Sequence, residues 1–303
     1  MPSPLFASDL QQFGPEATSQ KKAELTEAQA YCKQLTLTHY ENFTVGSWLL
    51  PKELRQPFCA VYAYCRWADD LADETGGGER TCELLDWWQR ELDACFAGET
   101  RHPVFVALEP VVRQFEIPQQ PFDDLLRAFR QDQTITRYES FDDLLAYCRC
   151  SANPVGRLIL YLGRCFDEQR AAWSDQICTG LQLANFWQDV ADDWQRGRVY
   201  LPQESCRRFG YDETMFAQAA HNGAFQNLLA FEVQRAETFL HNGLPLLATL
   251  PRRLRFDVSL FAQGGLAILE KIRRIEYDVW HRRPQLTRWD KFRLACRAWL
   301  RPA

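Results

Sequence analysis

Two pairs of aspartates in this chain have the spacing of a metal site. Asp69 and Asp73 are four residues apart, and so are Asp189 and Asp193. On a helix, residues four apart lie on one face, where two like charges repel and destabilise the helix. Carboxylate oxygens suit Mg²⁺, which takes one or two of them and completes its shell with water and phosphate oxygens. Two such helices facing each other would place four carboxylates around one cavity, where Mg²⁺ would stabilise a diphosphate as a leaving group.

Polar residues extend each pair into a longer stripe, and apolar residues surround it. Tyr62 and Arg66 precede the first pair on the same helical face, and Gln182 and Asn185 precede the second. The alternative is that each pair is only a charged helix surface. That interpretation fits one isolated pair better than two pairs that both lie among apolar residues and tryptophan. Asp70 and Asp192 point to other faces, and the sequence leaves open whether they are solvated or support the site.

The elements that must position these residues are helices. Periodicity, caps and breakers predict one all-α domain over 23–303, after a mobile lead-in over 1–22. The predicted helices span 24–39, 52–74, 81–97, 103–115, 121–132, 140–149, 154–165, 171–194, 223–240 and 252–279, with a short one near the end. Alternating runs rich in Val, Ile and Thr are almost absent, so no sheet is expected.

Composition excludes several classes of protein. The 303 residues carry a net charge of −5, with no basic excess for nucleic acid. No apolar stretch reaches the roughly 18 residues that span a bilayer, and the first residues lack the pattern of a secretory signal. Eleven scattered cysteines fit reduced thiols better than a disulfide scaffold or a zinc site. We therefore expect a cytoplasmic protein.

Further motifs accompany the two aspartate stripes. The segment Gly197-Arg198-Val199-Tyr200-Leu201-Pro202 follows the second stripe, and Tyr277-Asp278-Val279 lies near the C-terminus. Together these residues resemble the squalene and phytoene synthase family over about residues 38–283. The resemblance implies an isoprenoid synthase fold with helices around a central cavity, Mg²⁺ as cofactor and a prenyl diphosphate substrate. It implies metal ligands at Asp69, Asp73, Asp189 and Asp193, and substrate and cofactor contacts at His39, Asn42, Tyr62, Arg66, Gln182, Asn185 and Gln188.

Two segments narrow the resemblance. Residues 42–51 and 151–157 resemble the hydroxysqualene synthases of bacterial hopanoid biosynthesis. Relatives that make squalene or phytoene tend to have a basic residue in place of Glu41, Arg in place of Gln188, and a Tyr near Gly264 and Gly265. Because Arg suits phosphate recognition, its absence favours a substrate with a single diphosphate, presqualene diphosphate. Water would then convert it to hydroxysqualene and diphosphate, a carbon–oxygen lyase reaction.

Other functions were weighed against this one. Within the enzyme class, the alternative is a farnesyltransferase that joins two prenyl diphosphates head to head, as presqualene diphosphate, squalene or phytoene-type synthases do. A non-catalytic family member that assembles with other isoprenoid proteins is a third class. The four intact aspartates argue against it, because a scaffold has no need of paired like charges.

Several residues are candidates for steps at the carbon skeleton. Tyr147 matches a tyrosine that the family uses near the reacting carbons, and Asn153 is a candidate for positioning the water, or else an ordinary N-cap. Phe43, Phe186 and Trp187 are candidates for stabilising a cation, with core packing as the alternative. Gly264 and Gly265 leave room for substrate or water, or allow close helix packing.

The basic, amphipathic C-terminal segment, from Arg282 to Arg301, suggests contact with anionic lipid at the inner membrane. The alternative is a packed terminal helix. A functional coupling to an enzyme that makes presqualene diphosphate is also expected.

Overall fold

The computed structural model describes residues 4–17, 22–39, 52–291 and 293–294. Contacts divide the chain into two compact units, Met1–Thr134 with Leu158–Arg164, and Ile135–Arg157 with Cys165–Ala303. Within the described residues both are helical, and the one β-bridge there joins Arg137 to Val199. None of the described helices is long and apolar enough to cross a membrane.

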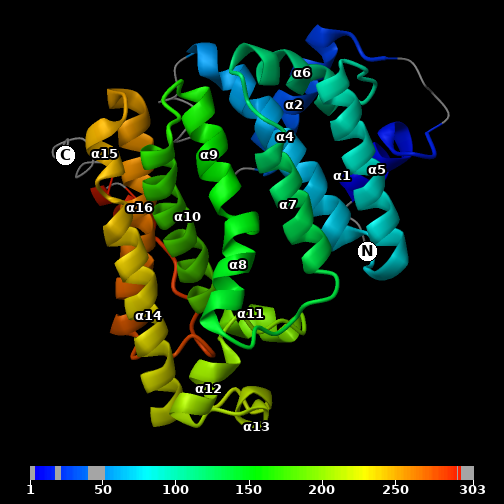
Figure 1. Cartoon of the computed structure of the whole chain (residues 1–303). Coiled ribbons are helices and arrows are strands. Elements are labelled where there is room, and N and C mark those ends of the chain that lie inside the picture. The colour runs from blue at the N-terminus through cyan, green and yellow to red at the C-terminus, as the bar shows by residue number, and fades with distance from the viewer. Residues whose placement is uncertain (1–3, 18–21, 40–51, 292, 295–303) are drawn as a thin grey trace. The chain divides into compact units, whose positions relative to one another are not determined.

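The first unit surrounds the helix that carries the first aspartate pair (Figure 1). Its helices are α1 (Pro4–Phe13), α2 (Leu25–His39), α4 (Lys52–Glu74), α5 (Gly78–Ala97), α6 (Pro103–Gln114) and α7 (Gln120–Gln131). Helix α4 contacts α2, α5, α6 and α7. Its buried face includes Trp67, which stacks on Trp88 with ring centroids 5.3 Å apart. Because so much of α4 is buried, its polar stripe is fixed in direction.

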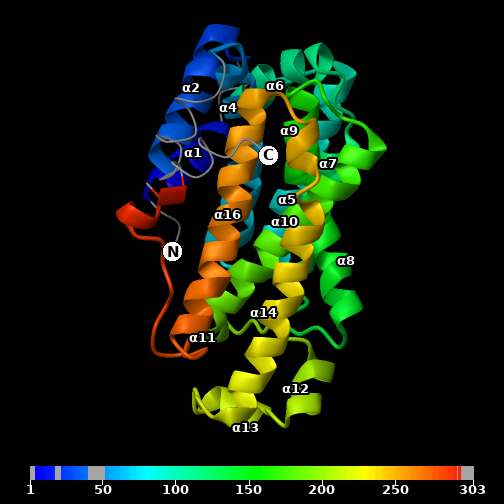
Figure 2. The same ribbon diagram turned by 90° about the vertical axis from the view of Figure 1, so that its left-hand side faces the viewer.

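The second unit is built around three long helices that run side by side (Figures 1 and 2). They are α10 (Glu168–Gln188), α14 (Gly223–Gly243) and α16 (Arg252–Arg274). The shorter helices are α8 (Phe141–Ser151), α11 (Val190–Gln195), α12 (Gln203–Phe209), α13 (Glu213–Ala217) and α15 (Leu246–Thr249). Helix α9 (Asn153–Leu162) begins in this unit and ends in the first.

Close helix packing explains one of the two glycines on α16. A Cβ at Gly265 would lie 2.7 Å from Leu181 on α10 and 3.1 Å from Leu240 on α14. A Cβ at Gly264 would meet only Leu286, at an ordinary 3.7 Å. Gly265 therefore lets α10, α14 and α16 approach one another, and Gly264 is not needed for this.

Most predicted helices match observed ones, but α12, α13 and α15 were not predicted, and three further differences appear. The helix predicted over 171–194 is two helices that meet at Asp189, and the one predicted over 252–279 ends at Arg274. It ends there because Glu276 and Tyr277 have left-handed backbones, with φ of 53° and 63°. Helix α1 was not predicted in the lead-in, where Phe6 is buried against Trp67 with ring centroids 5.3 Å apart. The mobility of residues 1–22 and the domain boundary at residue 23 stay predictions.

Candidate functional site

The first aspartate motif lies on the last turns of α4 and is organised by Arg66. Nη1 of Arg66 donates to Oδ2 of Asp69 over 3.3 Å. Tyr62 lies one turn before Arg66 and stacks on Phe58, with ring centroids 6.4 Å apart. Asp73 follows one turn after Asp69, with an exposed side chain. The predicted stripe is thus a continuous row on one helix.

Asp70 is buried and binds Arg66 in this motif. The sequence left open whether Asp70 is solvated or supports the site. Its side chain is only 2% exposed, and both of its carboxylate oxygens accept hydrogen bonds from Arg66. Nε of Arg66 donates to Oδ2 over 3.0 Å, and Nη2 donates to Oδ1. Burial raises the pKa of Asp70 to about 7, although the Arg66 guanidinium opposes that rise. Asp70 therefore holds the guanidinium that contacts Asp69.

The second aspartate motif lies at a break between α10 and α11. Asp189 has φ −108° and ψ 15°, outside the regular helical range. Its N–H still donates to the Asn185 carbonyl over 2.9 Å, and its own carbonyl accepts from the Asp193 N–H over 2.8 Å. Asp189 and Asp193 therefore remain one turn apart, as the spacing predicts. Gln182, partly buried, and Asn185, exposed, lie on the preceding turns of α10.

The carboxyl group of Asp193 is poorly compensated in this motif. Burial raises its pKa to about 7, and the neighbouring charge of Asp189 adds to the effect, whereas Arg196 and Arg198 oppose it. A hard cation between two such carboxylates would relieve both desolvation and repulsion.

Arg283 approaches this motif from a distant part of the sequence. Its Nε donates to Oδ1 of Asp189 over 2.7 Å and its Nη2 to Oδ2 over 3.1 Å. Nε also lies 3.4 Å from Oδ2 of Asp192. Next to it, the Gln188 side-chain amide donates to the Pro284 carbonyl over 2.5 Å. Sequence reasoning missed Arg283 as a site residue and counted it with the basic tail, because 94 residues separate it from Asp189.

A cluster of four rings lies in the same unit, around the buried Tyr147. Phe186 stacks on Tyr200 with centroids 3.8 Å apart and planes 9° apart. Tyr147 lies 5.9 Å from Tyr200, and Tyr138 lies 5.5 Å from Tyr147. Tyr200 comes directly from the segment that follows the second motif. Phe186 and Tyr147 are thus brought together.

Two other candidates have structural partners in the second unit. Trp187 is fully buried, and its Nε1–H donates to the Glu232 carbonyl over 3.1 Å, which favours core packing. Asn153 is also buried, and its Oδ1 accepts from the Thr179 hydroxyl over 2.9 Å. This oxygen binds α10 and is not the N-cap acceptor that the sequence offered as an alternative.

Four predicted residues lie at the end of α2 or beyond it. His39 is the last residue of α2, and Asn42, Glu41 and Phe43 lie outside the described residues. Asp69 and Asp73 belong to the first compact unit and Asp189 and Asp193 to the second. The roles assigned to all of these residues remain proposals.

The donor set fits Mg²⁺, although no group of three or more Asp, Glu, His or Cys side chains in the described chain is arranged to hold an ion by itself. Mg²⁺ commonly keeps several waters and uses only one or two carboxylates together with phosphate oxygens. In the second motif, Asp189 and Asp193 lie one turn apart and would supply the one or two carboxylates that Mg²⁺ uses. The pKa of Asp193 is raised, so a cation beside it would relieve the cost of its negative charge.

A helical chain with two acidic motifs of this kind has the features of enzymes that act on diphosphates. The match to a family model decides between such classes. The chain belongs to the squalene/phytoene synthase family, whose model matches residues 37–290. It is an enzyme of this family, whose members join prenyl diphosphates head to head.

Individual relatives agree with the family. The chain is 40% identical in sequence to squalene synthase HpnC from Alicyclobacillus acidocaldarius, whose crystal structure it matches with a TM-score of 0.81. The match covers 84% of this chain and 95% of that one. It is 32% identical over 273 residues to a phytoene synthase of Arthrospira platensis, covering 86% of this chain and 88% of the relative. A 15-cis-phytoene synthase of Synechocystis is 31% identical over 299 residues, covering 95% and 89%. The all-α fold predicted from the sequence is confirmed.

Proposed function

We propose that this enzyme converts presqualene diphosphate and water to hydroxysqualene and diphosphate. The 40% identity to the squalene synthase HpnC, against 31–32% for the phytoene synthases, favours the squalene branch of the family. Within that branch, the proposal is carried by the resemblance of residues 151–157 to hydroxysqualene synthases. An enzyme that joins two farnesyl diphosphates would have to supply this substrate, so we also propose a functional coupling to such an enzyme.

The surroundings of residue 188 support a substrate with one diphosphate. Relatives that join two diphosphates tend to have an arginine there, whereas the Gln188 amide of this chain is occupied by the Pro284 carbonyl. The nearby guanidinium of Arg283 is bound by Asp189. Residue 188 therefore supplies no cation for a second diphosphate.

The acidic residues would bind the substrate head group. We assign Asp69, Asp73, Asp189 and Asp193 to Mg²⁺ and the diphosphate, with His39, Asn42, Tyr62, Arg66, Gln182, Asn185 and Gln188 around them. Bound Mg²⁺ would neutralise the charge that develops on the leaving diphosphate. Arg66, held by Asp70, would orient Asp69 toward that charge.

The reaction begins when the carbon–oxygen bond breaks and its electron pair leaves with the diphosphate. The cyclopropylcarbinyl cation then rearranges, and a water oxygen bonds to the new cationic carbon and loses a proton. We assign the stabilisation of the cation to the buried rings around Tyr147, because the quadrupole of an aromatic ring attracts a cation. Asn153 is proposed to position the water, because a neutral amide binds water without trapping the cation.

A second function has its own support. Phytoene synthases are 31–32% identical to this chain over most of its length, which favours the joining of two prenyl diphosphates. Purified protein with Mg²⁺ and either farnesyl or presqualene diphosphate, with and without NADPH, separates the two by product mass. Hydroxysqualene from presqualene diphosphate without NADPH is expected. Rapid formation of presqualene diphosphate from farnesyl diphosphate alone would overturn the proposal.

We also propose that the C-terminal region contacts anionic lipid at the inner membrane, where the apolar product must go. Trp289, which is 77% exposed next to Arg288, supports this. Flotation with phosphatidylserine-containing vesicles is expected to fall for Trp289→Ala. Equal flotation of both proteins would contradict it.

A further inference from the structure

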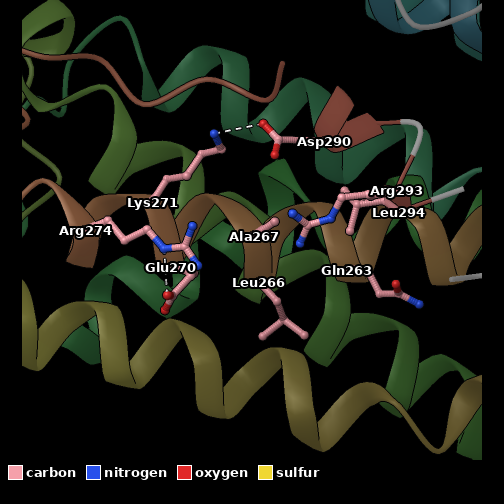
Figure 3. Close-up of a pocket in the computed structure, with 9 residues that line it drawn as sticks. All are labelled: Gln263, Leu266, Ala267, Glu270, Lys271, Arg274, Asp290, Arg293 and Leu294. Carbon is pink, nitrogen blue, oxygen red and sulfur yellow. Dashed lines mark hydrogen bonds and ion pairs between the residues drawn. The ribbon is translucent and has the colours of Figure 1, made fainter. Parts of the chain in front are cut away.

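A segment after α16, which we call the strap (residues 281–291), connects the second motif to α16. Leu286 lies over the face of α16 at Gly264, where an added Cβ would be 3.7 Å from its Cδ1, and Asp290 forms an ion pair of 2.8 Å with Lys271. Figure 3 shows Asp290 facing Lys271 beside a groove of about 410 Å³ on α16. At its other end the strap is bound by Gln188 through Pro284. Both ends are therefore attached, and Arg283 lies at the end next to Asp189.

Arg283 occupies the oxygens that a metal ion would use. Its two donor nitrogens bind the two oxygens of Asp189, a forked geometry that only arginine provides. The same Nε lies 3.4 Å from Asp192, so the guanidinium counters two of the three negative charges in this motif. A metal ion and this guanidinium compete for the same carboxylate.

We propose that Arg283 is a resident counter-ion of the second motif, which Mg²⁺ must displace from Asp189 before it can bind there. The proposal rests on the proposed function, because it takes Asp189 as a metal ligand. Without a diphosphate, the motif then binds metal only weakly, since Arg283 already compensates part of its charge. A diphosphate would supply further oxygen ligands to Mg²⁺, so that Asp189 would exchange the Arg283 guanidinium for the ion.

The exposure of the ion pair suits a contact that has to break. The side chains of Arg283 and Asp189 are 43% and 27% exposed, so solvent screens their attraction and the pair contributes little stability. A fully buried pair would resist displacement, because breaking it would leave an uncompensated charge. Arg283 therefore holds Asp189 weakly enough for a divalent ion to replace it.

Gln188 is a positioning residue in this arrangement. Its amide binds the backbone of the residue that follows Arg283, so it fixes the strap rather than contacting the acidic oxygens. Removal of that amide should loosen Arg283 without changing the charge of the site. We expect Gln188→Ala to shift metal binding in the same direction as the loss of Arg283, by a smaller factor.

Binding of Mn²⁺ alone, followed by electron paramagnetic resonance without substrate, tests the proposal. An Asp69→Asn background limits binding at the first motif. There, Arg283→Ala should tighten Mn²⁺ binding about tenfold, because a cation next to the site is removed. Arg282→Ala, which removes the same charge from the adjacent residue, should change it less than about twofold. Unchanged or weaker binding in Arg283→Ala would overturn the proposal.

Two further variants keep the test decisive if Arg283→Ala does not fold. Arg283→Lys keeps a cation but loses the fork, so tighter Mn²⁺ binding supports the proposal and unchanged binding contradicts it. For Gln188→Ala too, tighter Mn²⁺ binding supports the proposal and unchanged binding contradicts it. Because no substrate is present, these results are independent of the product that the enzyme makes, and a failure of the proposed reaction leaves them intact.

Discussion

The two aspartate motifs have the same spacing but obtain their cations in different ways. In the first, Arg66 comes from the same helix, four residues before the buried Asp70 that holds it. In the second, the cation is Arg283, which lies 94 residues after Asp189 in the sequence. The first motif is therefore organised by local helix geometry, and the second depends on a tertiary contact.

The backbones of the two motifs also differ, because the first lies on one continuous helix and the second lies where two helices meet. Helix α4 runs unbroken from Lys52 to Glu74 through the first motif, whereas the second lies where α10 gives way to α11 at Asp189. The hydrogen bond from the Asp193 N–H to the Asp189 carbonyl nevertheless keeps the two carboxylates one turn apart. A shared sequence pattern therefore does not imply that two motifs are neutralised by cations in the same way.

The largest effect is expected from removing one carboxylate of either motif. Asp69→Asn and Asp193→Asn should each lower turnover by about 10²- to 10³-fold, because each removes charge that stabilises the leaving group. Helix content, measured by circular dichroism, should hardly change. If one of the two variants kept normal turnover, the motifs would not be equivalent in catalysis and that metal assignment would fail.

A smaller effect tests the local organisation of the first motif. Asp70→Ala leaves the Arg66 guanidinium without its main partner and should lower the free energy of unfolding by about 2 kcal/mol at pH 8. That figure allows for the partial exposure of Arg66. The matched change in the second motif, Asp192→Ala, should stay within about 0.5 kcal/mol, since Asp192 is 55% exposed. Urea unfolding measures both, and equal losses would remove the proposed difference.

The pH dependence of metal binding tests the second motif. The pKa of Asp193 is raised to about 7, and a metal must displace the proton from the carboxyl group. Below pH 7 the apparent affinity for Mn²⁺ should therefore fall by about tenfold per pH unit, and above pH 8 it should be nearly constant. Titrations between pH 6 and 8.5 measure this, and Asp193→Asn should abolish the dependence. The same slope in that variant would assign the proton to another group.

The smallest effect concerns the packing that carries the second motif. Gly265→Ala would press on Leu181, next to Gln182, and should cost about 1 kcal/mol because the leucine ends can shift. Gly264→Ala meets only ordinary contact and should be neutral or slightly stabilising. Thermal unfolding of the two variants measures the contrast. A larger loss for Gly264→Ala would show that the Leu286 contact, rather than the α10 contact, is the tight one.

Local patterns in the sequence were sufficient for the fold class and for much of the first motif. Helical periodicity, caps and glycine stops specify α4 from Lys52 to Glu74, and spacing alone puts Asp69 and Asp73 on one face of it. The burial of Asp70 was not determined, because which helix covers a face depends on packing between distant segments.

Tertiary structure alone decided how the second motif is compensated. Spacing predicted that Asp189 and Asp193 share a face, and the backbone hydrogen bond between them agrees. It predicted neither the break at Asp189 nor the approach of Arg283, and the second of these is a contact between residues 94 positions apart. The sequence by itself thus determined which carboxylates are paired and which cation stands beside the first pair. The fold decided which cation meets the second pair, since that depends on a contact between residues far apart in the chain.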